Sequence, residues 1–156
     1  MPSIDLDDIT IHNKKLLQVI NEKTLPIIYD KEFYNNPLNG FSKIAYYGEI
    51  PVGIIKAKLI VPSNHSIPTS IYIESLAILK PYRNLGIGKK FIEFIKDEAK
   101  RSYLHEIKLH VWNHKSNTKL IEWYQNLGFE IKEELIDYYK KFDLETPNAY
   151  LLSIKF

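Results

Sequence analysis

The chain contains no cysteine among its 156 residues, and this absence excludes several kinds of chemistry. Without thiols there can be no disulfide, no thiolate zinc site and no cysteine nucleophile. No apolar run approaches the roughly 20 residues that a membrane-spanning helix needs. The first twenty residues carry Asp5, Asp7 and Asp8 and lack the apolar stretch of a secretory signal peptide. We therefore expect a cytoplasmic protein, with the nucleus as a second address.

An excess of one charge is also missing. The chain carries 21 basic and 19 acidic residues, a net charge of +2, and the two signs are interspersed. We therefore expect neither nucleic acid nor an anionic membrane as a partner. The segment His-Glu-Ile-Lys-Leu-His, residues 105–110, has one residue too many for a zinc-binding His-Glu-x-x-His helix and alternates like a strand. We assign no metal site.

The chain has enough apolar residues to form one hydrophobic core, because 45% of its residues are hydrophobic. That proportion and length suit a single domain over residues 1–156. Some apolar segments alternate like strands and others have helical spacing. This mixture predicts one α/β (mixed α+β) domain with a largely antiparallel sheet flanked by helices. The expected strands are residues 4–11, 71–79, 106–112, 129–136, 148–156 and a hairpin over 42–61 that turns at Gly48; the expected helices are residues 14–22, 86–101 and 116–129.

The expected helix ends rest on capping residues. Asn13 is expected to cap the first helix, and Asp30 a short additional helix that ends before Pro37. Gly128 is expected to end the last helix, because a left-handed residue often follows a helix C-terminus.

Two glycines stand at the start of the helix expected over residues 86–101. The N-terminus of a helix is an anion site, because its first N–H groups lack helical partners and the helix dipole is positive there. Gly86 and Gly88 would keep Cβ atoms away from a phosphate, and Arg83 would add a positive charge. Lys89 and Lys90 oppose the dipole, and a bound polyphosphate would offset that repulsion.

Other glycine motifs do not match this segment. Lys90 stands where a P-loop has Ser or Thr, and the third glycine of the dinucleotide fingerprint is missing. A tight turn that merely requires glycine is the alternative. The preceding strand, Arg83 and the long helix favour pyrophosphate binding.

Residues 83–88, "RNLGIG", resemble the acetyl-CoA pyrophosphate loop of the GNAT acyltransferases, whose pattern is Arg/Gln-x-x-Gly-x-Gly/Ala. A second family signature follows, in which Asn117 and Tyr124 stand seven residues apart before a Gly-Phe pair. Within this superfamily the chain is similar to the NatE-type (San) N-terminal acetyltransferases. The similar stretches are "LPIIYDKEFY", "LKPYRNLGIG", "IKLHV", "WYQNLGFEI" and "DYYKK".

The resemblance implies a central sheet that is splayed where two parallel strands part, with acetyl-CoA wedged into the split. The strand before the glycine loop would pair its backbone with the pantetheine arm. Read without the resemblance, Asn117 is equally a helix cap and Tyr124 a core aromatic. The loop before Asn117 is two residues longer than in close relatives. The implied cofactor-binding residues are Leu76, Ala77, Ile78, Arg83, Asn84, Leu85, Gly86, Ile87, Gly88, Lys89, Asn117 and Tyr124.

The resemblance also implies direct transfer of the acetyl group to an amine. Tyr72 and His110 match a catalytic pair that works through an ordered water, and a His with an ordinary pKa near 6.5 suits a proton acceptor. Glu74 departs from close relatives, which carry an apolar residue there. Many other GNAT enzymes place a Glu on this strand as a general base or to hold a water. Either Tyr72 and His110 act while Glu74 shapes the pocket, or Glu74 is the base. We expect Tyr72, Glu74 and Leu76 to share one face of their strand.

The implied peptide site consists of two aromatic loops that clamp the substrate backbone and an apolar second residue. The relatives favour an initiator Met, but an acidic wall at Glu74 suits a different first residue. On the residues alone, these loops are equally surface segments packed on the core. The implied substrate-binding residues are Leu25, Pro26, Ile27, Tyr29, Tyr138 and Tyr139.

Our leading hypothesis from the sequence is an acetyl-CoA-dependent acetyltransferase acting on protein N-termini, with Met followed by an apolar residue as the expected substrate. One alternative is a GNAT enzyme for polyamines, other small amines or lysine side chains. Another is a weakly active subunit that binds a larger ribosome-associated acetyltransferase complex, as relatives do. The intact Arg83, Gly86 and Gly88 argue against loss of cofactor binding.

Overall fold

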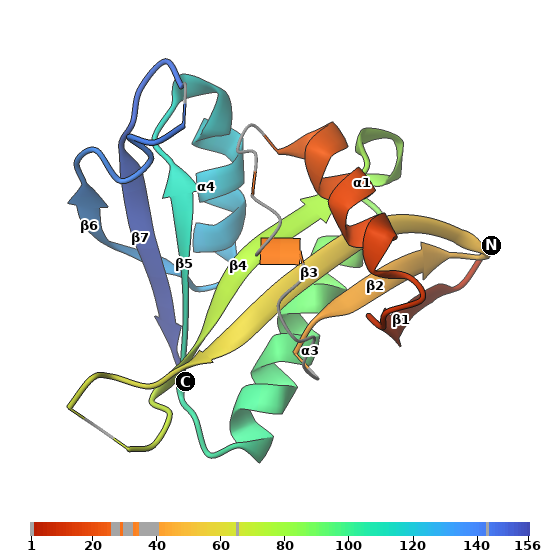
Figure 1. Ribbon diagram of the computed structural model, residues 1–156, viewed down its shortest axis with the longest axis horizontal. Coiled ribbons are helices and arrows are strands. Elements are labelled where there is room, and N and C mark those ends of the chain that lie inside the picture. Colours follow the sequence, from red (N-terminus) through yellow and green to blue (C-terminus); the bar gives the residue numbers. More distant parts are fainter. Residues whose placement is uncertain (1, 26–28, 30–32, 35–40, 65, 143) are drawn as a thin grey trace.

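The computed structural model describes residues 2–25, 29, 33–34, 41–64, 66–142 and 144–156. They form a seven-stranded sheet with helices on both faces (Figure 1). The strand order is β1-β2-β3-β4-β5-β7-β6, and every neighbouring pair is antiparallel except β4 and β5. This confirms the mixed α/β class with a largely antiparallel sheet. No described helix is long and apolar enough to cross a membrane.

The described elements follow the sequence-based prediction within a few residues. Phe33 and Tyr34 are helical, but most of the short helix expected from Asp30 to before Pro37 lies outside the described residues. The strands are β1 (Ile4–Asp8), β2 (Lys43–Tyr47), β3 (Ile50–Ile60), β4 (Ser70–Ile78), β5 (Glu106–Trp112), β6 (Glu130–Leu135) and β7 (Ala149–Lys155). The helices are α1 (Lys14–Thr24), α3 (Ile87–Arg101) and α4 (Thr118–Asn126), with 3-10 turns at Lys80–Tyr82 and Lys115–Asn117.

The helices divide the core between the two faces of the sheet. On one face the apolar stripe of α3 is buried together with side chains of α4, and Phe91 and Ile95 are fully buried there. On the other face Leu17 and Ile20 of α1 pack against Ile54 of β3. In Figure 1, α1 crosses in front of the sheet and α3 lies behind it. The central strands are therefore covered on both sides.

The parallel strands β4 and β5 separate along their length. Their register covers only Ile71 with Ile107, Tyr72 with Lys108 and Ile73 with Leu109, although both strands are fully described. In Figure 1 the two strands start together at the lower end of the view and diverge upward. The second half of β4 therefore does not pair with β5.

A β-bulge in β4 changes which residues share a face. Lys56 of β3 pairs with Ser75 and the next residue, Ala57, pairs with Ile73, so Glu74 is an extra residue in β4. Side chains that follow a bulge are displaced by one step of the alternation. Leu76 accordingly packs on the α3 side rather than beside Tyr72 and Glu74. The expectation that Tyr72, Glu74 and Leu76 share one face is therefore wrong for Leu76.

Asn13 precedes α1, but its side chain does not cap the helix. Its Oδ1 accepts a hydrogen bond from the Thr10 N–H at 2.7 Å, and its Nδ2 donates to the Asp8 carbonyl at 2.9 Å. These bonds hold the turn that ends β1 at Asp8 instead of Ile11. The expected role of Gly128 holds, since it follows α4 with a φ of 105°.

Candidate active site

Tyr72 of β4 and His110 of β5 meet where the two parallel strands begin to separate. The Tyr72 hydroxyl lies 2.6 Å from Nδ1 of His110. Ile73 and Leu109 form the last pair of the parallel register, so His110 is the first residue of β5 beyond it. The side chains of Leu109 and Val111 are buried in the α3-side core, which leaves His110 on the opposite face with Tyr72. The splay thus starts at a hydrogen-bonded pair of titratable side chains.

Burial keeps both members of this pair uncharged near neutral pH. Burial lowers the pKa of His110 from 6.5 to about 4. Burial, and then the hydrogen bond with Tyr138, raise the pKa of Tyr72 well above its ordinary value of 10. His110 therefore does not titrate near 6.5, as the sequence-based expectation assumed, because the site removes the charged imidazolium from water.

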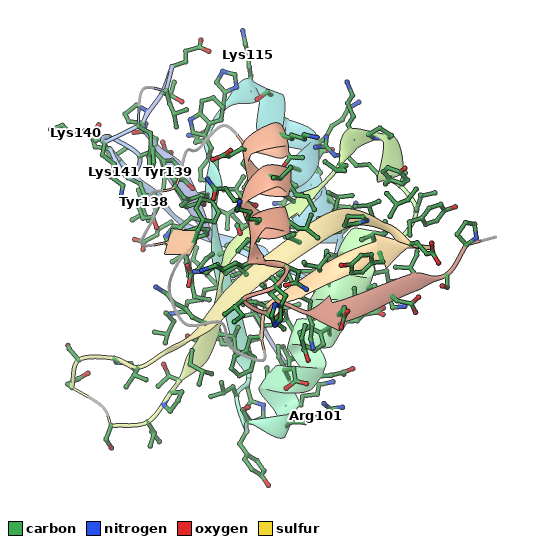
Figure 2. The ribbon with its side chains drawn as sticks, turned by 45° about the vertical axis from the view of Figure 1, so that its right-hand side comes forward. Arg101, Lys115, Tyr138, Tyr139, Lys140 and Lys141 are labelled. Atoms are coloured by element: carbon green, nitrogen blue, oxygen red, sulfur yellow. The ribbon has the colours of Figure 1, made fainter. Side chains whose placement is uncertain are left out.

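The loop after β6 covers this pair with an aromatic side chain. The ring of Tyr138 stacks on His110 with centroids 4.2 Å apart, and its hydroxyl lies 3.3 Å from that of Tyr72. Tyr138 is 42% exposed, whereas the adjacent Tyr139 is 8% exposed and packs against Trp112 and Ala149. Figure 2 shows both tyrosines at the same side of the molecule. Of the two, Tyr138 faces the site and Tyr139 anchors its loop.

Tyr29 lies beside β4 and also packs against the cluster of Tyr139 and Ala149. Its hydroxyl donates a hydrogen bond to the backbone carbonyl of Glu74 at 3.2 Å, and its ring stacks on Phe33 with centroids 3.9 Å apart. Leu25 packs against the α1-side core. The other two residues expected in this loop, Pro26 and Ile27, lie outside the described residues.

Glu74 is held in an ion pair that the sequence did not predict. Its Oε2 lies 2.7 Å from Nζ of Lys56, and the two side chains are 14% and 6% exposed. Nζ of Lys56 also lies 4.0 Å above the ring of Phe33. The signal that could have revealed Lys56 is a lysine within the apolar run of β3, "VGIIKAKLI". Because its charge is paired with Lys56, Glu74 is not a free carboxylate.

The glycine loop, residues 83–88, leads into the N-terminus of α3. Gly86 has a φ of 85° and immediately precedes the helix, and Asn84 is also left-handed with a φ of 65°. A Cβ at Gly86 would meet no atom within 4 Å, so the space before the helix is open. Arg83 donates from Nε to the Ile78 carbonyl at 3.0 Å and stays exposed. Free helix N–H groups, open space and a guanidinium together fit a diphosphate.

Gly88 has a different role from the one expected. It is buried, and a Cβ on it would lie 2.9 Å from Cζ2 of Trp123 in α4. Its small size therefore lets α4 approach α3, rather than clearing space for a phosphate. Lys90 also points away from the helix mouth, because its Nζ donates to the carbonyl of Ile4 in β1.

Asn117 immediately precedes α4, and Tyr124 lies in the last turn of that helix. The Asn117 side chain does not cap the helix but donates from Nδ2 to the Trp112 carbonyl at 3.0 Å. Tyr124 is 4% exposed, and burial raises its pKa. In the longer loop before them, Nδ1 of His114 accepts from the Ser116 N–H at 3.1 Å. Within the described residues, no hydrogen bond connects Asn117 or Tyr124 to the Tyr72–His110 pair.

Known proteins are similar to this chain in sequence and in fold. Residues 10–129 match the acetyltransferase (GNAT) family. N-alpha-acetyltransferase 50 of Danio rerio is 35% identical over 152 residues, covering 96% of this chain and 86% of that protein. The probable N-acetyltransferase san of Drosophila melanogaster is 36% identical, covering 96% and 79%. Among solved structures, Arabidopsis thaliana Naa50 in complex with the bisubstrate analogue CoA-Ac-MVNAL has a TM-score of 0.86 and 30% identity, covering 99% of both chains. The chain therefore belongs to the acetyltransferase (GNAT) family.

Proposed function

We propose that this enzyme transfers an acetyl group from acetyl-CoA to the α-amine of protein N-termini. The observation that carries the proposal is the Tyr72–His110 pair, which lies at the start of the splay between β4 and β5. The similar Danio rerio protein is named as an N-alpha-acetyltransferase. The similar Arabidopsis structure holds an analogue that joins CoA, an acetyl group and the peptide MVNAL. These relatives support a peptide N-terminus as acceptor over a polyamine or a lysine side chain.

Acetyl-CoA supplies a thioester-activated acetyl group when it is bound. In this chain Arg83, Gly86 and the first N–H groups of α3 would hold its diphosphate. The backbone of residues 76–78, which does not pair with β5, would hold its amide-containing arm, and this needs no particular side chain. The side chains of Leu76 and Ile78 pack in the core, which agrees with a role for their backbone alone.

The acceptor amine sets how much base catalysis the enzyme must provide. A free α-amine has a pKa near 8 and a lysine side chain near 10.4. At pH 7 roughly a tenth of an α-amine is neutral, against well under a thousandth of a lysine. The neutral Tyr72–His110 pair therefore suits an α-amine better than a lysine.

Tyr72 and His110 would take up the amine proton together. We assign the shared proton to the hydroxyl of Tyr72, which donates to Nδ1 of neutral His110. The oxygen of Tyr72 then has a lone pair for a proton from the amine, directly or through a water, as it passes its own proton to His110. Glu74 is the weaker candidate for the base because Lys56 already binds its carboxylate.

The tyrosine walls would position the peptide. Tyr29 is bound to the Glu74 carbonyl and Tyr138 lies at the Tyr72 hydroxyl, and each combines an apolar ring with a hydroxyl. Such walls suit the peptide backbone and an apolar second residue. The first residue expected from the relatives is Met, but its side chain would meet the ion pair of Glu74 and Lys56.

We also propose that the enzyme works in the cytoplasm, where N-termini emerge from ribosomes, in association with a larger N-terminal acetyltransferase complex. Sedimentation of the full chain with ribosomes, with and without high salt, tests this association. Recovery of the chain only in the soluble fraction would remove the proposed association and leave the proposed reaction intact.

A peptide panel tests the proposed function. The panel contains peptides with a free N-terminus, the same peptides with a blocked N-terminus and one internal lysine, and spermidine as a small amine. Release of CoA and the mass of each product are measured. We expect acetylation of free N-termini only. Acetylation confined to lysine or spermidine would contradict the proposal.

A further inference from the structure

The ion pair of Glu74 and Lys56 lies next to the reacting groups, yet the proposed proton transfer does not use it. Oε2 of Glu74 is bound to Lys56 at 2.7 Å. Oε1 lies 4.0 Å from Nζ of Lys58, which is too far for a hydrogen bond. Among the described residues no hydrogen-bond donor reaches Oε1. One oxygen of a largely buried carboxylate is therefore left for a donor from the substrate.

The position of Glu74 places this oxygen near the first residue of a peptide. Tyr72 and Glu74 are two residues apart on the face that α1 covers, and the bulge between them makes their separation shorter than the roughly 6.8 Å of a regular strand. The first side chain branches from the carbon that carries the reacting amine. When the amine is at the Tyr72 hydroxyl, this side chain comes within reach of Glu74. Tyr29, bound to the Glu74 carbonyl, and Phe33, beside Lys56, fix the surroundings of the pair.

We propose that Glu74 and Lys56 select a first residue with a short hydrogen-bond donor, serine or threonine, over methionine and valine. The proposal rests on the proposed acetylation of α-amines. The substrate hydroxyl donates to Oε1 of Glu74, whereas an apolar side chain removes water from Oε1 and gives no bond in return. A hydrogen bond to a charged group corresponds to at least about a tenfold preference.

The charges around the pair limit the donor further. Among the described residues, Lys56 and Lys58 place two positive charges beside the one carboxylate of Glu74. A lysine or arginine at the first position would donate to Oε1 but meet this positive charge. An aspartate or glutamate has no proton to donate to Oε1 at neutral pH. The site therefore suits a neutral donor.

The test compares peptides that differ only in the first residue, each followed by leucine. Threonine and valine form the main comparison, because they differ by a hydroxyl in place of a methyl group. Serine and alanine form a second comparison, and methionine is included. For the wild-type enzyme we expect kcat/KM for threonine to exceed that for valine about tenfold or more. Equal values, or a preference for valine or methionine, would overturn the inference.

A variant that lacks the whole Glu74–Lys56 ion pair tests whether this pair causes the preference for threonine. The double variant Lys56→Met, Glu74→Met removes both buried charges, whereas a single replacement would leave one of them unpaired; Lys58, which remains, is exposed. We expect its threonine-to-valine ratio to fall to about one or below and its activity on methionine-first peptides to rise. A ratio unchanged from wild type would overturn the assignment to this pair.

Two controls keep the result interpretable. The variant Glu130→Met, Lys132→Met removes an exposed ion pair of the same length, 2.7 Å, from β6 and should keep the wild-type ratio. If the Lys56/Glu74 double variant does not fold, the wild-type ratio alone decides the inference. If no peptide is acetylated at its α-amine, the proposed function fails; if α-amines are acetylated without a threonine preference, only this inference fails.

Discussion

The hydroxyl of Tyr72 and Nδ1 of His110 lie 2.6 Å apart, across two parallel strands that separate immediately beyond them. The strands bring together residues 38 positions apart in the chain. One hydrogen bond thus marks the place where β4 and β5 stop pairing with each other.

Replacement of Tyr72 by Phe should abolish most activity without loss of acetyl-CoA binding. The variant keeps the ring and removes the oxygen that exchanges the proton, so we expect kcat to fall by about 100-fold or more. Tyr103→Phe is the matched control, because Tyr103 is 87% exposed and follows α3 near Arg101, at the end of the molecule away from Tyr138 (Figure 2). Calorimetry with acetyl-CoA checks binding. Near-normal turnover in Tyr72→Phe would contradict the role of this hydroxyl.

The pH profile of the wild-type enzyme should lack an inflection between pH 6 and 7. Burial lowers the pKa of His110 to about 4, so His110 is already neutral throughout this range. We expect kcat/KM to rise with pH toward the pKa of the peptide α-amine, near 8. Initial rates from pH 5 to 9.5 at low peptide concentration measure the profile. An ascending limb centred near 6.5 would show that His110 titrates as an ordinary histidine.

Acid should destabilise the protein through His110. The unfolded chain binds a proton to this residue as pH falls below 6.5, whereas the folded protein does so only near pH 4. Because the unfolded state binds more protons between these values, the free energy of unfolding decreases as pH falls through this window. In His110→Gln the decrease should be smaller. Urea unfolding at pH 7 and pH 4.5 measures both slopes, and equal slopes would contradict the lowered pKa.

Replacement of Gly88 by Ala should destabilise the fold by about 1–3 kcal/mol through overpacking. The added Cβ would lie 2.9 Å from the Trp123 ring. Trp123→Phe removes the atoms that it would meet, so the double variant should be more stable than the sum of the two single effects predicts. Chemical denaturation of the four proteins measures this coupling. Additive effects would show that Gly88 does not limit the approach of α4.

Much of the framework could be predicted from local sequence. The alternation in β4 and β5, the stripe of α3 and the glycine after α4 each reflect a short-range rule, and each matches the structure. The pyrophosphate loop was predicted from the family resemblance and from the rule that a helix N-terminus favours anion binding. Its Gly86 has the open, left-handed geometry that such a loop requires.

The remaining features depend on contacts between distant segments. The sequence does not show which helix packs on Gly88, that Lys56 is buried against Phe33, or that His110 loses water under Tyr138. Nor does it show the extra residue in β4, because a bulge is defined by the register of the partner strand. These features explain why Gly88 packs against α4, why Leu76 lies on the α3 side of the sheet and why the pKa of His110 is lowered.

The bulge also keeps the position of Glu74 apart from the alternation of core side chains in β4. If Glu74 is left out, the residues before and after it alternate without interruption between the two faces, as in an ordinary strand. Glu74 is thus an inserted position, and its side chain is coupled to the buried Lys56 rather than to the apolar pattern of the strand. Evolution can therefore exchange Glu74 and Lys56 together while the hydrophobic pattern of β4 stays the same.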